Sequence, residues 1–244
     1  MRSPSSEEIL AIWEAALAEH PIDRALTIAA AFSGQSKRTL AQLPVGVRDS
    51  LLFQARECLF GPRLESFAEC PSCAGSLEFA VAIDELPLSP CGELEIAAAP
   101  GVAYQPAVYE TKAGLRFRLP NSFDLAAIAA MEDVGQAERL LVRRCVVKND
   151  ADLDDRALEE VNRAIAERDP AGDLELSLVC PACACRWTQL FDIGYFFWRE
   201  LNSFARRLMG EVDALARAYG WPEQAILQLS PARRARYLEM VTSA

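Results

Sequence analysis

The stretches Cys70-Pro71-Ser72-Cys73 and Cys180-Pro181-Ala182-Cys183 decide the fold of this 244-residue chain. Each places two thiols three positions apart in a tight turn, so that both sulfurs point at one centre. Two such pairs supply the four sulfur ligands of a tetrahedral structural zinc site. The spacing therefore predicts one metal site made by Cys70, Cys73, Cys180 and Cys183, with zinc as the metal.

Alternating apolar residues flank both cysteine pairs. Residues 64–69 and 76–81 surround the first pair, and residues 174–179 and 186–191 surround the second, so each unit reads as strand, metal turn and strand. This pattern is typical of a zinc ribbon, split here by an insertion. Closing a loop of that size costs roughly 4 kcal/mol, whereas a structural zinc site contributes about 10 to 16 kcal/mol, so the metal can hold the two halves together.

The cysteines admit three other chemistries. A Cys-Pro-x-Cys sequence also occurs in glutaredoxin-like redox sites, but there a helix follows, whereas strand-like residues follow both pairs here. Disulfides need an oxidising compartment, and residues 1–8 contain no apolar signal region, which favours a reduced cytoplasmic protein. Iron binds the same four sulfurs, but nothing nearby suggests an electron-transfer partner. The other cysteines are interpreted as core or bystander residues, although Cys185 could compete for metal; they are Cys58, Cys91, Cys145 and Cys185.

Composition sets the fold class. With 51% hydrophobic residues the chain can bury a sizeable core, and no stretch approaches the roughly 20 apolar residues that cross a bilayer. A net charge of −10 disfavours nonspecific binding to nucleic acid or to an anionic membrane. The expected fold is α+β, mainly helical, in four regions: N-terminal helices in residues 1–62, a split zinc ribbon in 63–85 and 173–193, an inserted hairpin and helical module in 86–172, and a C-terminal helical region in 194–244.

Capping residues and apolar periodicity predict the helices. The N-terminal region should hold a helix that starts at Ser5 or Ser6 and breaks at Pro21, then helices over 23–32 and 47–60. The only histidine, His20, is expected to cap a helix or face solvent. A hairpin over 107–110 and 115–119 should begin the insertion, followed by helices from 121 to 131, 136 to 147 and 154 to 167. Four aspartates before the last helix loosely resemble a calcium loop but lack its glycine and its glutamate in register, so they predict a helix start; they are Asp150, Asp152, Asp154 and Asp155.

The C-terminal region is predicted to begin with a long helix over 194–219. Its apolar stripe should be core, while the aromatic residues on its other faces either cover the ribbon or meet a partner. A final helix after Ser230-Pro231 carries three arginines, which on an acidic protein indicate a solvated face or a protein-docking patch more than a DNA-binding helix. The residues expected to bind a partner protein are Trp198, Trp221, Arg233, Arg234 and Arg236.

Several further stretches carry a resemblance to a known family. They are the first cysteine pair, the second pair with Trp187, and the segments 43–52 (LPVGVRDSLL), 117–125 (FRLPNSFDL), 219–222 (YGWP) and 229–239 (LSPARRARYLE). In this order they resemble a small family from contractile phage tails and extracellular contractile injection systems, described as baseplate proteins or baseplate hub assembly chaperones of the T-even phage type. Zinc ribbons often carry glycine after the second cysteine of each pair, and this chain departs from that pattern with Ala74 and Ala184.

The resemblance implies a non-enzymatic assembly role, with baseplate or tail proteins as partners, in the cytoplasm of a bacterial or infected host cell or on the particle itself. The residue inventory agrees, because the sequence contains no phosphate loop, no nucleophile elbow and no histidine placed as a base. We therefore expect no catalytic residues, no cofactor-binding residues besides the metal ligands, and no small-molecule substrate. Two alternatives stay open: a zinc-ribbon nucleic-acid-binding regulator and a Cys-Pro-x-Cys thiol oxidoreductase.

Overall fold

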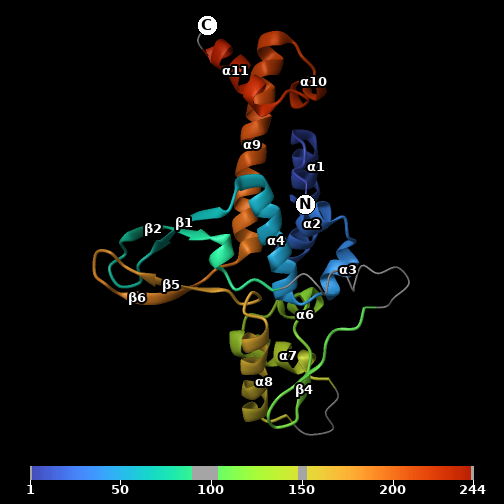
Figure 1. Ribbon diagram of the computed structural model, residues 1–244, viewed down its shortest axis with the longest axis vertical. Coiled ribbons are helices and arrows are strands. Elements are labelled where there is room, and N and C mark those ends of the chain that lie inside the picture. Colours follow the sequence, from blue (N-terminus) through green and yellow to red (C-terminus); the bar gives the residue numbers. More distant parts are fainter. Residues whose placement is uncertain (1, 90–103, 148–152, 243–244) are drawn as a thin grey trace.

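Helix α9 (Ile193–Tyr219) runs along the long axis of the molecule toward the C-terminal end in the computed structural model, which describes residues 2–89, 104–147 and 153–242 (Figure 1). The Asp192 side chain accepts a hydrogen bond from the Tyr195 amide at its start, and Gly220, with φ of 67°, ends it in the left-handed region. The long helix predicted over residues 194–219 is therefore present. The predictions at Cys91, Asp150 and Asp152 lie outside the described residues.

Gly34, which follows helix α2 (Pro21–Ser33), ends that helix in the same left-handed conformation with φ of 71°. Both helices therefore end at a glycine because a residue without a Cβ adopts a positive φ at little cost.

The N-terminal region folds into four helices. A capping box between Ser5 and Glu8 starts the first, and His20 caps the second by accepting a hydrogen bond on Nδ1 from the Ile22 amide at 3.3 Å. Pro21 is the first residue of that second helix, so it begins a helix as well as breaking the run before it. The short third helix was not predicted. The four helices are α1 (Ser6–Ala16), α2 (Pro21–Ser33), α3 (Lys37–Gln42) and α4 (Val45–Phe60).

The main core lies where these helices meet the first half of α9. Phe53 of α4 and Ile28 of α2 are buried together with Phe197 and Leu201 of α9. The N-terminal helices and α9 are thus packed into one body. Along α9 the burial continues through Leu208 to a smaller cluster with α1, so the predicted apolar stripe does face other helices.

The ribbon consists of two antiparallel hairpins that project from the side of this body (Figure 1). Strand β1 (Arg63–Glu69) pairs with β2 (Ser76–Ala82), which leads into the short helix η1 (Ile83–Glu85). Strand β5 (Glu175–Val179) pairs with β6 (Arg186–Leu190). The predicted strand, turn and strand order is therefore confirmed on both sides of the insertion.

The inserted module lies at the opposite end of the molecule from the C-terminus (Figure 1). Its small core contains Phe117, Val142 and Val161. The predicted hairpin is present, but each strand is only two residues long. The elements of the module are β3 (Tyr109–Glu110), β4 (Arg116–Phe117), α6 (Ser122–Ile128), α7 (Val134–Cys145) and α8 (Asp155–Arg168).

Asp169, at the end of α8, joins the module to the main body. One of its carboxylate oxygens accepts a hydrogen bond from the Gly46 amide at 2.9 Å, and the other accepts one from Ser89 Oγ at 2.8 Å. Helix α4 has no side-chain cap of its own at Pro44, so a carboxylate 123 residues away caps its first turn. Gly46 is required here because a Cβ at this position would lie 1.8 Å from Asp169 Oδ1.

Asp124 makes a second polar centre inside the module. Its carboxylate is 1% exposed and pairs with Arg118 at 2.5 Å and Arg144 at 3.0 Å. Burial alone would raise the pKa of Asp124, but hydrogen bonds from Arg118 and from the Asn121 amide, together with the two arginine charges, hold that pKa below its ordinary value. The ion pairs of Asp124 with Arg118 and Arg144 therefore stabilise the folded protein while Asp124 is ionised.

Two short helices close the C-terminal end: α10 (Glu223–Leu227) and α11 (Pro231–Thr242). Arg234 of α11 is only 2% exposed, and its Nε donates to Glu211 Oε2 of α9 at 2.8 Å. Its Nη1 donates to Ser6 Oγ at 3.3 Å and to the Leu229 carbonyl at 3.1 Å. The prediction that Arg234 belongs to an exposed docking patch is therefore wrong, because the helix packs this side chain against α9 and α1.

Candidate metal centre

The two hairpin tips bring the four predicted cysteine sulfurs together. Cys70 Sγ lies 3.6 Å from Cys183 Sγ, Cys73 Sγ lies 3.6 Å from Cys180 Sγ, and all four sulfurs lie within 4.8 Å of one another. A tetrahedral ion with metal–sulfur bonds of about 2.3 Å holds its sulfurs about 3.8 Å apart. The cluster therefore fits a four-sulfur metal ion with only small adjustments.

Each cysteine pair sits in the same backbone turn. In the first turn the Ala74 amide donates to the Cys70 carbonyl at 2.9 Å, and the Cys70 amide donates to the Gly75 carbonyl at 3.0 Å. The second turn repeats both bonds: the Ala184 amide donates to the Cys180 carbonyl at 3.0 Å and the Cys180 amide to the Cys185 carbonyl at 2.9 Å. Because the turns match, the two hairpins present their sulfurs to the common centre in the same way.

The alanine after each pair adopts the left-handed conformation in which glycine is favoured. Ala74 has φ of 56° and Ala184 has φ of 57°. The turn therefore keeps the left-handed residue that glycine usually supplies, with alanine in its place. An L residue pays about 1 kcal/mol or more in this region, and metal binding can offset that cost.

Hydrogen bonds lower the thiol pKa of Cys70 and Cys180 and raise that of Cys73. Backbone hydrogen bonds, that of the Cys73 amide foremost, lower the pKa of the Cys70 thiol to about 6, and the Cys183 and Ala182 amides lower the pKa of Cys180. The Gly75 amide acts to lower the pKa of Cys73, but the neighbouring thiols outweigh it and raise that pKa to about 12. A dication would remove this conflict, since it stabilises all four thiolates at once.

The remaining described cysteines lie outside the four-sulfur group. Cys145 is buried, and its burial raises the pKa of its thiol to about 12, as expected for a core residue. Cys58 is half-buried. Cys185 is half-buried beside the centre, but the four-sulfur cluster found among the described residues does not include it, and its carbonyl serves the turn. Its predicted competition for metal stays untested.

The residues predicted to bind a partner protein are spread along α9 and the C-terminal helices. Trp198 is half-buried on the main body, with the Arg24 guanidinium 4.3 Å from its ring centroid. Trp221 is half-buried and stacks on Tyr219, with ring centroids 4.7 Å apart. Arg233 and Arg236 are exposed.

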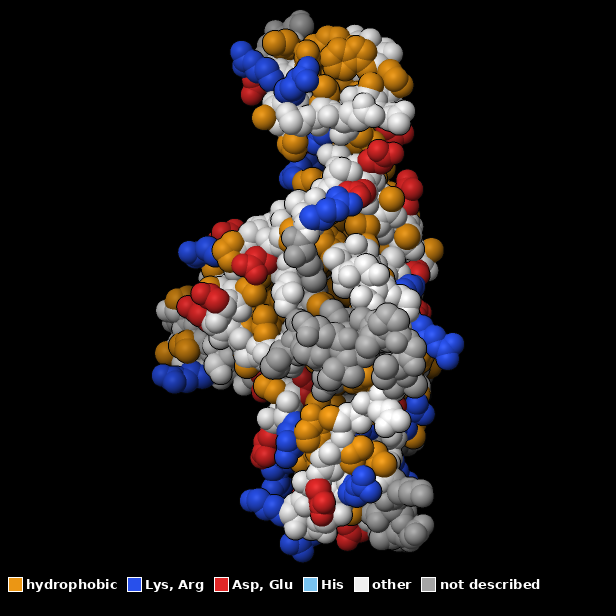
Figure 2. Space-filling model, turned by 45° about the vertical axis from the view of Figure 1, so that its right-hand side comes forward, with side chains coloured by type: hydrophobic (Ala, Val, Ile, Leu, Met, Phe, Trp, Pro, Cys, Tyr) orange, Lys and Arg blue, Asp and Glu red, His pale blue; other side chains and the backbone are white. Residues whose placement is uncertain are grey.

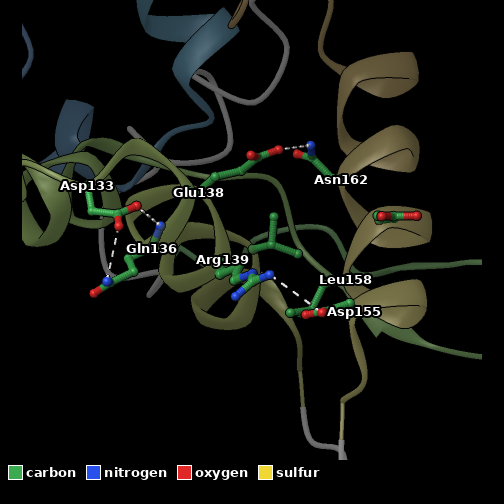
Figure 3. Close-up of a pocket in the computed structure, with 10 residues that line it drawn as sticks. Asp133, Gln136, Glu138, Arg139, Asp155, Leu158 and Asn162 are labelled. Atoms are coloured by element: carbon green, nitrogen blue, oxygen red, sulfur yellow. Dashed lines mark hydrogen bonds and ion pairs between the residues drawn. The ribbon is translucent and has the colours of Figure 1, made fainter.

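The module also contains a polar cleft of about 530 Å³ between α7 and α8 (Figure 3). Its side chains pair with one another: Asn162 Nδ2 donates to Glu138 Oε1 at 2.7 Å, and Arg139 lies 3.5 Å from Asp155. Asp133 caps α7 by accepting from the Gln136 amide at 2.9 Å. These contacts join the two helices and fix the start of α7.

Comparison with family models, with curated proteins and with solved structures finds no match for this chain. Among the described residues, no helix combines the length and the apolar character needed to cross a bilayer. Metal binding by the four-sulfur cluster is the chemistry that the described residues indicate.

Proposed function

We propose that this chain is a zinc-containing, non-enzymatic assembly factor or minor component of a contractile phage tail or injection-system baseplate, and that it acts by docking onto a baseplate or tail protein. The proposal rests on the sequence resemblance. The four-sulfur cluster supports its metal-binding part, and zinc is the metal that takes an all-sulfur tetrahedral set in structural sites.

Two of the stretches that carry the resemblance pack against each other. The Val45 amide donates to the Pro120 carbonyl at 3.0 Å, and Arg48 Nη1 donates to Ser122 Oγ at 3.1 Å. Their residue types are therefore explained by the joint between the main body and the inserted module. This favours a structural role for these stretches over a catalytic one.

The docking proposal rests on the aromatic, apolar and arginine side chains of the C-terminal tip, defined as residues 219–241. Tyr237 meets Trp221 edge to face with ring centroids 5.0 Å apart, and Met240 is 51% exposed beside the exposed arginines Arg233 and Arg236. Figure 2 shows hydrophobic side chains and Lys or Arg side chains together at this end of the molecule. Aromatic and arginine side chains supply most of the strong contacts at protein interfaces.

The test is capture of the neighbouring baseplate proteins by the purified chain. Replacing Arg233 and Arg236 by glutamate should reduce capture about tenfold or more, because both side chains are exposed and one contact of this kind contributes about 2 kcal/mol. The matched control replaces Arg156 and Arg163 of α8 by glutamate, which changes the net charge equally on another exposed surface. Equal capture by both variants would contradict docking through the tip.

The same protein preparation tests the two alternatives. Tight binding of duplex DNA, with affinity that falls steeply as salt rises, together with no capture of tail proteins, would replace the assembly role by nucleic-acid regulation. Disulfide reduction that is lost on Cys70→Ala would indicate a thiol oxidoreductase. Mass spectrometry of purified particles would show whether the chain remains in the finished assembly.

A further inference from the structure

An apolar groove of about 540 Å³ runs between α6, α7 and α8 of the inserted module. Its floor contains Leu125 and Ile128 from α6, Leu141 from α7 and Ile165 from α8. All four side chains are only half-buried. Three helices thus direct apolar side chains toward one space that the described residues leave open.

The groove is distinct from the small core of the module. Phe117, Val142 and Val161 fill that core, whereas Leu125, Ile128 and Leu141 are not part of it. On α7, Val142 faces the core and Leu141 faces the groove, so this helix has two apolar surfaces. The contact between Glu138 and Asn162 separates the groove from the polar cleft, since both residues line both spaces (Figure 3).

Exposed apolar residues extend the groove at its rim. Val134, at the start of α7, is 79% exposed, and Leu190, at the end of β6, is 58% exposed. Contiguous apolar surface of this kind marks interaction sites on soluble proteins. The rim therefore continues the surface that a partner would cover.

The charged residues that line the groove have one sign. Glu138 and Asp173 are exposed carboxylates, and no Lys or Arg occurs among the described residues that line it. Asn162, which donates a hydrogen bond to Glu138, carries no charge. A partner with basic residues beside its apolar face would complement this rim.

We propose that the groove binds an amphipathic helix of another protein, with its apolar side chains in the groove and its Lys or Arg side chains near Glu138 and Asp173. Helix-in-groove recognition uses anchors at i, i+3 or i+4, and i+7, which suits a groove lined by helices. This site does not depend on the proposed baseplate role or on the C-terminal tip.

The experiment uses the full chain and a fluorescent 18-residue model helix, with leucines on one face and lysines on the other, and a second peptide with glutamates in place of the lysines. The lysine peptide should bind, and Leu141→Asp should weaken it about tenfold or more. Leu140→Asp is the matched control, because Leu140 is an exposed neighbour that does not line the groove. Val134→Asp should weaken binding as well, and because Val134 is 79% exposed the fold should tolerate this change.

The role of charge is tested by reversing the charge of one carboxylate at the rim of the groove. Glu138→Lys should weaken the lysine peptide and strengthen the glutamate peptide, whereas Glu132→Lys, at an exposed position outside the lining, should change neither by more than about twofold. Equal binding of both peptides, or binding that survives Leu141→Asp and Val134→Asp, would overturn the proposal. A homodimer in sedimentation that Val134→Asp dissociates would assign the groove to a second copy of the chain and overturn it too.

Discussion

Gly46→Ala tests the joint between the main body and the inserted module. The new Cβ would lie 1.8 Å from Asp169 Oδ1, so the buried carboxylate must move away from the Gly46 amide and from Ser89. Losing a hydrogen bond to a charged group costs about 1.5 to 3 kcal/mol, and overpacking adds about 1 to 3 kcal/mol. We expect the free energy of unfolding to fall by about 3 to 5 kcal/mol.

Urea unfolding followed by circular dichroism measures this loss, and hydrogen exchange locates it in α4 and α8. The matched control is Gly210→Ala in α9, where an added Cβ meets nothing within 4 Å. That change should stabilise the protein by about 0.5 to 1 kcal/mol, because glycine is unfavourable inside a helix.

A double-mutant cycle separates the clash from helix propensity. Once Asp169→Ala has removed the carboxylate, adding Gly46→Ala should cost little more, so the two effects should be strongly non-additive. Additive effects, or a Gly46→Ala variant that behaves like Gly210→Ala, would refute the reasoning.

Three other outcomes are expected. Elemental analysis should give about one zinc per chain, with metal lost on Cys180→Ser and kept on Cys185→Ser; retention by Cys180→Ser would contradict the four-sulfur site. Replacing Ala74 and Ala184 by glycine should slow metal transfer to a chelator, because it relieves the left-handed φ values of 56° and 57°. The pKa of Asp124 is lowered in the folded state, so ionised Asp124 stabilises the fold above its ordinary pKa of 3.8. This stabilisation is lost as the pH falls through the lower folded pKa, and acid unfolding of Asp124→Asn should not show that loss of stability.

Local patterns in the sequence were sufficient to predict the cysteine turns and most helices. A four-residue turn contains both of its cysteines, so the candidate metal ligands could be recognised from spacing alone. Ser5 and Glu8 likewise carry their capping signal within one turn. These features need no knowledge of which distant segments meet.

Features that depend on distant contacts escaped the sequence analysis. The arginines of α11 look alike in sequence, yet Arg234 is buried because Glu211 and Ser6 lie 23 and 228 residues away along the chain and meet it only after folding. The groove was missed for a similar reason. Leu141 and Val142 are both apolar, and only the packing of α8 on α7 shows that one faces the core and the other does not.

Protein contacts at the base of the ribbon reduce what a bound metal would have to stabilise. The ribbon is anchored at its base by protein contacts: Arg56 pairs with Glu200 at 2.8 Å and donates to the carbonyls of Gly61 and Arg63, both at 2.6 Å. Asp169 independently holds the inserted module to α4. These contacts also hold the ends of the insertion together, so they would share the loop-closure cost with a bound metal. A metal ion bound by the four sulfurs would therefore act chiefly on the hairpin tips.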